Sequence, residues 1–306
     1  MIKISCILPV NNHLEYLNKS IESILNQTFH NFELIIIVNT KNKKIYQKII
    51  DYKKKDKRIK VFIKKTGNLA ELLNYGIHKS KGDFIARQDS DDISHEKRFE
   101  LQLKWFQKKT KKNMTKVLCG TNGYAINKKG DVTGGLKFLK FSHPEIKERL
   151  IFSNCFVHSS VMLNYKFLKR RLRYNKYFTF TQDYDLWTKI VNYGETCNLK
   201  KKLVFYRILK KKRKDNKLYI QTSLAILVAS NYYYYKLFKK FKKFSKSFKE
   251  EIKKLEKIEK LKMHIKVLKY IYKRNLPDNT ISLKELSFYE VFKNIRNTLF
   301  LKSLIR

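Results

Sequence analysis

Residues 82–92 read GDFIARQDSDD, an apolar segment that runs directly into three closely spaced carboxylates. Like charges at this spacing repel one another, so the cluster is costly unless a cation neutralises it. In an extended strand alternate side chains point the same way, so we expect Asp89 and Asp91 to face one site and Asp92 to face away. Oxygen ligands of this kind suit Mg²⁺ or Mn²⁺, which in turn suit phosphate oxygens. Alternatively, the acidic turn would cap the following helix, with Ser94 as N-cap.

The segments before this stretch alternate between strand and helix patterns. Strands are expected at 3–10, 33–38, 59–63 and 83–88, with amphipathic helices between them at 14–25, 43–55 and 68–80. This βαβαβαβ order predicts a doubly wound α/β sheet of mostly parallel strands. Ligands of such sheets bind at the carboxyl ends of the strands, where Pro9, Asn39 and Asp89 fall.

The rest of the chain divides into a mixed middle and a lysine-rich end. In the middle we expect a helix at 95–110, strand-like runs at 116–126 and 156–163, a helix after Asp183 and a last strand near 203–207. After Lys210 the pattern becomes helical with few turn signals. The predicted organisation is a domain at 1–210, with halves 1–92 and 93–210, followed by a basic helical region at 211–306.

Composition restricts the class of protein. The 306 residues are 43% hydrophobic, enough for a sizeable core, and carry a net charge of +43. That charge suggests nucleic acid or an anionic membrane as a partner. Lysine rather than arginine carries the excess and no nucleic-acid-binding motif is present, so we do not expect a nucleic-acid partner.

Cysteine usage and hydropathy indicate a cytoplasmic protein. The four cysteines are widely separated and form no C-x-x-C pair, which is typical of free core thiols in a reducing compartment. The N-terminus enters a strand pattern too early for a signal peptide. The segment 218–238 approaches the length of a membrane span but contains Gln221, Thr222, Ser223, Ser230 and Asn231, so it is predicted to be a buried or interfacial helix.

Three blocks of sequence together resemble the family 2 glycosyltransferases, which have the GT-A fold. ISCILPV at 4–10 with Asn12, followed by SIESILNQTF at 20–29, is similar to the family's opening. Residues 82–92 resemble its D-x-D segment. HSSVM at 158–162 and TQDYDLW at 181–187 resemble its acceptor-side H-P-T-V-M and E-D-Y-D-L-W motifs. The blocks occur in the family's order and span roughly 1–207.

The resemblance implies an inverting transfer of a sugar from a nucleoside-diphosphate donor to a glycan or lipid-linked acceptor, in surface polysaccharide, lipopolysaccharide or capsule synthesis. Asp91 would bind a Mn²⁺ or Mg²⁺ ion that bridges the diphosphate, and Asp89 would contact the ion or the ribose. Asp183 would be the base that takes the acceptor's proton. The remaining implied site residues are Pro9, Asn12, Asn39 and Arg87 on the donor side and His158, Asp185 and Trp187 on the acceptor side.

Several of these residues also fit structural roles. Asp183 and Asp185 would be favourable at the N-terminus of a helix in any protein. Trp187 lies on the apolar face of that helix and would pack in the core rather than stack on a sugar. His158 would either contact a substrate or support the scaffold.

Other positions leave part of the chemistry open. Arg87 and Arg98 flank the acidic cluster and would either contact the diphosphate or hold the carboxylates in place. Asn39 stands where the family usually has an aspartate, Asn11 replaces an aromatic residue, and Tyr206 begins a segment that lacks a histidine common in relatives. The alternative function is therefore a catalytically weakened relative that binds a glycan or a nucleotide.

The end of the chain carries more than half of the excess charge. From 200 to 306 there are 31 Lys and Arg against 8 Asp and Glu. Within 236–249, four phenylalanines recur at helical spacing among seven lysines. Such a helix is suited to an anionic membrane interface, so 236–272 is predicted to bind the inner face of the cell membrane. Docking on the catalytic domain or on a coiled-coil partner is the alternative.

Overall fold

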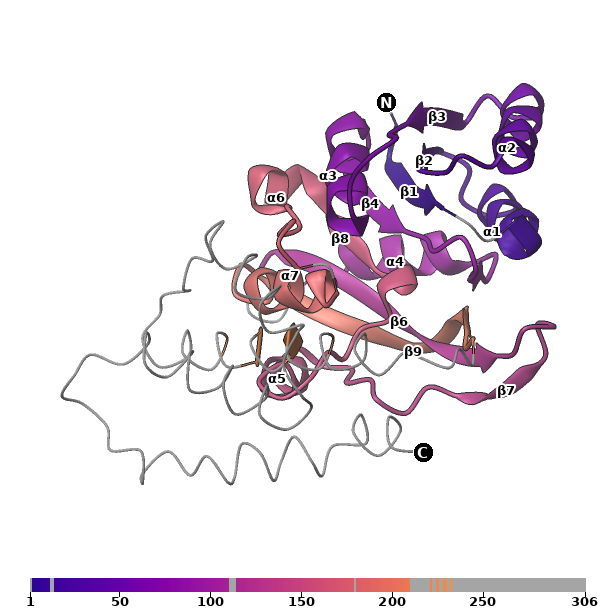
Figure 1. Ribbon diagram of the computed structural model, residues 1–306. Helices are drawn as coiled ribbons and strands as arrows, with labels where there is room; N and C mark the ends of the chain where they lie inside the picture. The colour runs from indigo at the N-terminus through magenta and orange to yellow at the C-terminus, as the bar shows by residue number, and fades with distance from the viewer. Residues whose placement is uncertain are drawn as a thin grey trace, which may run out of the picture.

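The computed structural model describes residues 2–11, 14–109, 114–178 and 180–209, together with Gln221, Leu224, Ala225, Val228, Ala229 and Tyr232. In this part of the chain, nine strands form one mixed sheet with helices on both faces (Figure 1). The strand order is β3-β2-β1-β4-β8-β6-β9-β5, and β7 pairs with β6 off this path. The α/β sheet expected from the sequence is confirmed.

The first four strands run parallel and alternate with helices, as the sequence predicts. Their bounds are β1 Ile4–Val10, α1 Leu14–Leu25, β2 Phe32–Val38, α2 Lys43–Lys55, β3 Ile59–Ile63, α3 Leu69–Lys79 and β4 Phe84–Arg87. Local signals define these ends. Asn68, for example, caps α3 by accepting from the backbone N–H of Glu71, whose carboxylate accepts from the N–H of Asn68 in return.

The connections create a topological switch point between β1 and β4. The chain leaves β1 towards β2 and β3, then returns through α3 to the other side of β1. Crevices at the carboxyl ends of strands at such a point are the usual ligand sites of open α/β sheets. Residues 88–92 follow β4 at this edge, so the fold delivers the acidic cluster to the switch point.

The second half of the sheet is mixed in direction. β8 is antiparallel to both β4 and β6, β9 is parallel to β6, and β5 is antiparallel to β9. The bounds are β5 Ile93–Ser94, α4 Arg98–Gln107, β6 Lys116–Ile126, β7 Val132–Gly135, α5 His143–Arg149, η1 His158–Ser160, β8 Met162–Asn164, α6 Tyr165–Leu168, η2 Lys169–Arg171, α7 Gln182–Ile190 and β9 Glu195–Arg207.

The expected strand at 156–163 is wrong over most of its length. The 3₁₀ turn η1 occupies its centre, and only Met162–Asn164 pairs as a strand. The hydroxyl of Ser160 donates to the carbonyl of Val157 and accepts from the backbone N–H of Thr121. These two bonds hold the segment as a turn, because a local side-chain partner competes with sheet pairing.

Two further boundaries differ from the sequence expectation. Helix α4 begins at Arg98 rather than at 95, because the backbone N–H of His95 donates to the carbonyl of Leu203 and prolongs the β5–β9 pairing. Strand β9 begins at Glu195, well before 203, because it pairs with β6 over most of that strand's length.

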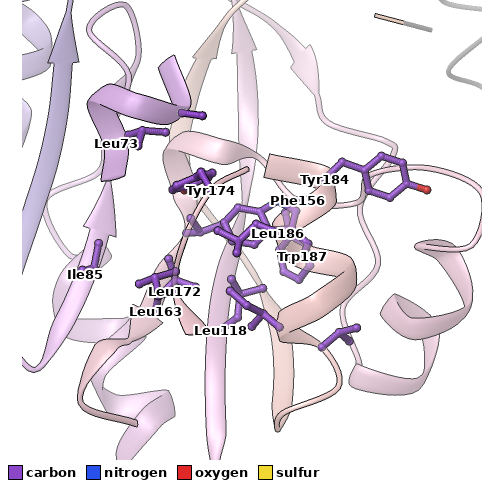
Figure 2. Packing of buried hydrophobic residues seen from close by; sticks show 14 of the residues in the cluster. Leu73, Ile85, Leu118, Phe156, Leu163, Leu172, Tyr174, Tyr184, Leu186 and Trp187 are labelled. Carbon is purple, nitrogen blue, oxygen red and sulfur yellow. The ribbon is translucent and has the colours of Figure 1, made fainter. Parts of the chain in front are cut away.

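Two hydrophobic layers cover the sheet. In β1, Cys6 and Leu8 face a layer built with α1, α2 and α4, whereas Ile7 faces the layer that contains α3 and α7. The alternation follows from the two-residue period of a strand. Figure 2 shows the second layer, where Trp187 and Leu186 of α7 pack beside Tyr174 and Phe156.

The described positions beyond 209 belong to this second layer. Leu224, Val228, Ala229 and Tyr232 are buried within it, and their spacing of three and four residues is that of one helix face. This burial agrees with the expectation of a buried or interfacial helix at 218–238. Within the described residues, no helix is both long and apolar enough to span a bilayer.

Candidate functional site

An ion pair fixes the first carboxylate of the acidic loop. The guanidinium Nη2 of Arg87 lies 2.5 Å from Oδ1 of Asp89, and Nη1 donates to the carbonyls of Ile7 and Gln88. The Arg87 side chain is 2% exposed and that of Asp89 is 29% exposed. Burial alone would raise the pKa of Asp89, but the Arg87 guanidinium, together with His158 and the Ser159 hydroxyl, holds that pKa below its usual value. Arg87 therefore holds a carboxylate in place, the second of its two expected roles.

Asp92 turns into the protein, the direction expected from the sequence, although β4 ends at Arg87 and the aspartates lie in a turn rather than in a strand. Its Oδ2 accepts from the hydroxyl of Ser159, and its Oδ1 accepts from the backbone N–H of Arg207 at 2.7 Å. Burial, reinforced by Asp89 and Asp91, raises its pKa well above the usual value. Asp92 thus joins the acidic loop to η1 and to the end of β9.

Asp91 lies between these two anchored carboxylates and is half-buried. Its backbone carbonyl accepts from Nε of Arg207 at 2.8 Å. Arg207 therefore holds two consecutive residues of the loop, through its backbone and its side chain. Of the three aspartates, Asp89 and Asp91 retain solvent exposure and Asp92 does not.

The capping interpretation of the acidic turn is wrong. The N-cap of α4 is Lys97, and it makes no side-chain cap hydrogen bond. The Ser94 hydroxyl instead donates to Oε1 of Gln88 at 2.8 Å, while Nε2 of Gln88 donates to the carbonyl of Asp92. The Ser20 hydroxyl donates to the carbonyl of Asp89 at 2.7 Å. These polar groups support the loop from the α1 side.

Arg98 supports the loop from below. It is fully buried, and its Nη1 donates to the carbonyls of Arg87 and Ser159. Burial lowers the pKa of its guanidinium to about 10, so it remains a cation at neutral pH. Arg98 therefore holds the backbone of Arg87 and Ser159. Because its side chain is buried and engaged there, it fits this supporting role rather than contact with a diphosphate.

Asp183 lies in the first turn of α7, which begins directly after Thr181, a residue in a left-handed conformation with φ 60°. Such a conformation is uncommon for a β-branched residue. Oδ2 of Asp183 accepts from Nδ2 of Asn154 at 2.8 Å. Burial raises its pKa, and the charge of Asp89 adds to the rise. The fold therefore brings Asp183 within electrostatic reach of the acidic loop.

Asp185 and Trp187 have structural surroundings. Asp185 is buried, and its Oδ2 pairs with Nζ of Lys189 at 2.5 Å, one turn along the helix. Trp187 is fully buried, with its ring 5.9 Å from that of Phe156. Of the alternatives stated for these two residues, the structural ones fit the geometry.

His158 occupies the space between the acidic loop and α7. Its Nε2 lies 2.9 Å from the hydroxyl of Tyr174, and its ring makes an edge contact with Trp187 at 6.0 Å. Burial lowers the pKa of the imidazole to about 3; the Arg87 guanidinium lowers it further and Asp89 opposes the change. His158 is therefore neutral at neutral pH.

Pro9 lies near the carboxyl end of β1, and Asn39 follows the carboxyl end of β2. Pro9 lies opposite Ile37 in the β1–β2 register. Nδ2 of Asn39 donates to the carbonyl of Lys64 at 2.6 Å, which ties the end of β2 to the end of β3. Asn12 lies outside the described residues. Sequence reasoning placed Asn39 at the correct edge but missed this contact.

Sequence reasoning did not include Tyr206 among the candidate site residues. Tyr206, at the end of β9, is 37% exposed. The pKa of its phenol is raised by burial and then by the carboxylates of Asp92, Asp89, Asp91 and Asp183. The Tyr206 phenol therefore lies close enough to all four carboxylates to feel their negative charge. The signal that could have found it was the absence of the family's histidine at the same strand end.

The carboxylates fit a hard cation held jointly with a substrate. In the described part of the chain, no group of three or more His, Cys, Asp and Glu side chains is arranged to enclose a metal ion. Mg²⁺-type ions are commonly held by one or two carboxylates plus phosphate oxygens. Asp89 and Asp91, the two of the three carboxylates that keep solvent exposure, match such a donor set in type, whereas both oxygens of the buried Asp92 accept from protein donors.

Comparison with known proteins places the chain in a family. The family model for glycosyl transferase family 2 matches residues 5–223. The O-antigen biosynthesis glycosyltransferase WbnJ of Escherichia coli is 35% identical over 209 residues, which cover 67% of this chain and 79% of WbnJ. The uncharacterized glycosyltransferase MJ1057 of Methanocaldococcus jannaschii is 36% identical over 192 residues, covering 61% and 64% of the two chains.

Solved structures share the architecture. S. aureus TarS 1-349 in complex with UDP-GlcNAc aligns with a TM-score of 0.56 at 14% identity, covering 82% of this chain and 70% of that one. The mannosyltransferase PcManGT from Pyrobaculum calidifontis, in complex with GDP-Man and Mn²⁺, aligns with a TM-score of 0.55 at 11% identity, covering 99% and 82%. The chain belongs to glycosyl transferase family 2 and is a glycosyltransferase with the GT-A fold.

Proposed function

We propose that this glycosyltransferase transfers a sugar, with inversion, from a nucleoside-diphosphate donor to a hydroxyl of a glycan or lipid-linked acceptor. The observation that carries the proposal is that the carboxylates of Asp89, Asp91 and Asp183 all lie within electrostatic reach of the Tyr206 phenol, and that Asp89 acts on Asp183 directly. Similarity to an O-antigen biosynthesis enzyme supports surface polysaccharide synthesis as the setting. The nucleotide sugars bound by TarS and PcManGT support the donor class.

The donor diphosphate would lie over the loop 88–92 at the switch point. A Mn²⁺ or Mg²⁺ ion, when bound, would offset the negative charge that the leaving nucleotide gains in the transition state. Asp91 would hold that ion, and the Mn²⁺ in the PcManGT complex supports the choice. Arg87 keeps Asp89 ionised and oriented, so Asp89 can contribute an oxygen to the ion or accept from the ribose.

Asp183 would accept the proton of the acceptor hydroxyl as that oxygen attacks the sugar from the face opposite the leaving group. A general base must lie across the reacting carbon from the leaving group. Asp183 comes from α7, a different element from the loop that would hold the diphosphate. The raised pKa of Asp183 makes it a stronger base than an exposed aspartate. Asn154 orients its carboxylate.

A turnover assay tests the proposal. Nucleotide sugars are incubated with the enzyme and Mn²⁺, and release of nucleoside diphosphate is followed for a panel of bases and sugars. We expect hydrolysis or transfer with at least one donor, and its loss in Asp91→Asn but not in Asp51→Asn, an exposed acid on α2. Unchanged turnover in Asp91→Asn would contradict the metal assignment.

The same assay decides the alternative function. A catalytically weakened relative would bind nucleotides without turning over any donor of the panel. The lack of the family's usual histidine in the segment that begins at Tyr206 is the observation that favours this alternative. Nucleotide binding without turnover in wild type, across all donors with Mn²⁺ and Mg²⁺, would support it.

We further propose that the basic segment 236–272, which lies outside the described residues, binds anionic membrane at the cytoplasmic face. Truncation at 210 is a poor test, because it would remove Leu224, Val228 and Tyr232 from the core. Full-length protein with Lys239, Lys240, Lys242 and Lys243 changed to Gln is a better probe. We expect it to sediment less with phosphatidylglycerol vesicles than wild type does. Equal sedimentation would contradict this proposal.

A further inference from the structure

The loop 172–178, which leads into α7, is clamped by a helix of the donor half. The side chain of Asn74 in α3 donates from Nδ2 to the carbonyl of Tyr174 and accepts at Oδ1 from the N–H of Tyr174, each at 2.8 Å. Nδ2 of Asn68 donates to the carbonyl of Lys176 at 2.7 Å. One amide side chain thus satisfies both backbone groups of Tyr174, as a neighbouring strand would.

The clamp fixes the position of the Tyr174 ring. The ring is 3% exposed and packs against Trp187 with centroids 6.4 Å apart (Figure 2). Its centroid lies 5.6 Å from that of His158, and its hydroxyl is 2.9 Å from Nε2 of the imidazole. The backbone, the ring and the hydroxyl of Tyr174 are therefore all held in place, and the hydroxyl is held by His158.

We propose that Tyr174 is a positioning residue that fixes the orientation and the tautomer of His158, and that Asn74 anchors Tyr174 for this purpose. A neutral imidazole has one donor and one acceptor nitrogen. With the phenol donating to Nε2, the ring proton resides on Nδ1. His158 then presents a fixed N–H donor, suited to a sugar or phosphate oxygen of the bound substrates. The catalytic meaning of this inference rests on the proposed function.

Electrostatics support the placement. The low pKa of His158 keeps the imidazole neutral and able to accept from the phenol. Burial raises the pKa of the Tyr174 phenol, with the Asp183 and Asp89 carboxylates adding to the rise, so the hydroxyl retains its proton. Those two carboxylates come from different elements, Asp183 from α7 and Asp89 from the loop after β4. Tyr174 therefore lies where the donor and acceptor halves meet, and the Asn74 clamp joins the two halves.

A purely structural role predicts a different outcome. If Tyr174 only packs in the core, Tyr174→Phe changes little, because the ring and its contacts remain. The matched control is Tyr177→Phe, which removes a half-buried hydroxyl from the same loop. Asn74→Ala tests the anchor, and thermal melting checks that each variant folds.

The experiment reads the His158 side chain directly. Full-length protein labelled with ¹⁵N-histidine is examined by long-range ¹H–¹⁵N correlation, and the His158 signals are assigned by their loss in His158→Gln. We expect the Nδ1–H tautomer in wild type and in Tyr177→Phe. We expect mixed tautomers in Tyr174→Phe and Asn74→Ala. An Nε2–H tautomer in wild type, or an unchanged His158 spectrum in Tyr174→Phe, would overturn the proposal.

Turnover gives the second readout. We expect kcat for the best donor to fall about 5- to 10-fold in Tyr174→Phe, the effect of losing one hydrogen bond, while KM for the donor changes less than twofold. A Tyr174→Phe enzyme as active as Tyr177→Phe would overturn the catalytic part. If wild type turns over no donor, the proposed function fails, and the histidine spectra still decide whether Tyr174 sets the tautomer.

Discussion

The acidic loop after β4 and the first turn of α7 each carry aspartates of two kinds. In the loop, Asp92 is 1% exposed and bonded to protein donors, whereas Asp91 is half-buried. In α7, Asp185 is 1% exposed and paired with Lys189, whereas Asp183 is half-buried. The comparison teaches that surroundings, rather than residue type, separate the fully buried carboxylates that hold the fold from the half-buried ones that we propose act on the substrates.

The largest expected effect separates the two aspartates of α7, Asp183 and Asp185. Asp183→Asn removes the base and should lower kcat by about 10³-fold, within the usual range for a general base, with little change in melting temperature. Asp185→Asn loses an ion pair and should lower kcat less than about tenfold while reducing stability. Initial rates and thermal melts of both variants measure the difference. Equal losses of kcat would contradict the division of roles.

The next effect concerns the loop. Asp92→Ala leaves the Ser159 hydroxyl and the Arg207 N–H without their acceptor, so the free energy of unfolding should fall by about 1–3 kcal/mol. Asp92→Asn keeps an acceptor oxygen and removes a buried charge, so it should lose less. Urea unfolding measures both, with Asp51→Ala as an exposed control expected within about 0.5 kcal/mol of wild type. If Asp92→Ala left the free energy of unfolding unchanged, the bonds of Asp92 to Ser159 and Arg207 would not be needed for stability.

The smallest expected effect is a shift in the pH dependence of turnover, which reports the surroundings of Asp183. Burial raises the pKa of Asp183, so the base becomes protonated at a higher pH than an ordinary aspartate does. Turnover should therefore decline as pH falls, with a midpoint of the acid limb above the usual aspartate value of about 3.9. A kcat–pH profile in mixed buffers at fixed Mn²⁺ measures the midpoint. An acid limb at or below that value would indicate a different base.

The sequence predicted the donor half well because its signals are local. The helices and strands from Ile4 to Arg87 follow alternating or helical apolar patterns, and their ends carry caps such as Asn68. The position of the acidic cluster followed from the connectivity alone. Its facing depends instead on distant contacts, since β4 ends at Arg87 and Asp92 is turned inward by Ser159 and Arg207.

The acceptor half was harder because its structure depends on contacts distant in sequence. The turn at η1 is held by Thr121 and by Asp92, so the local pattern at 156–163 could not show it. The roles of Asn74 and Tyr174 depend on bonds across 100 residues. Motif resemblance found Asp183, but only the fold shows that Asn154 orients it.

One measurement tests the central claim that Asp91 holds the donor through a cation and Asp183 performs the chemistry. Calorimetry would compare binding of UDP and GDP, each with and without Mn²⁺, to wild type, Asp91→Asn and Asp183→Asn. We predict that Mn²⁺ tightens binding of one nucleotide to wild type and to Asp183→Asn, and not to Asp91→Asn. Mn²⁺-dependent binding of equal strength in Asp91→Asn and wild type would contradict the claim.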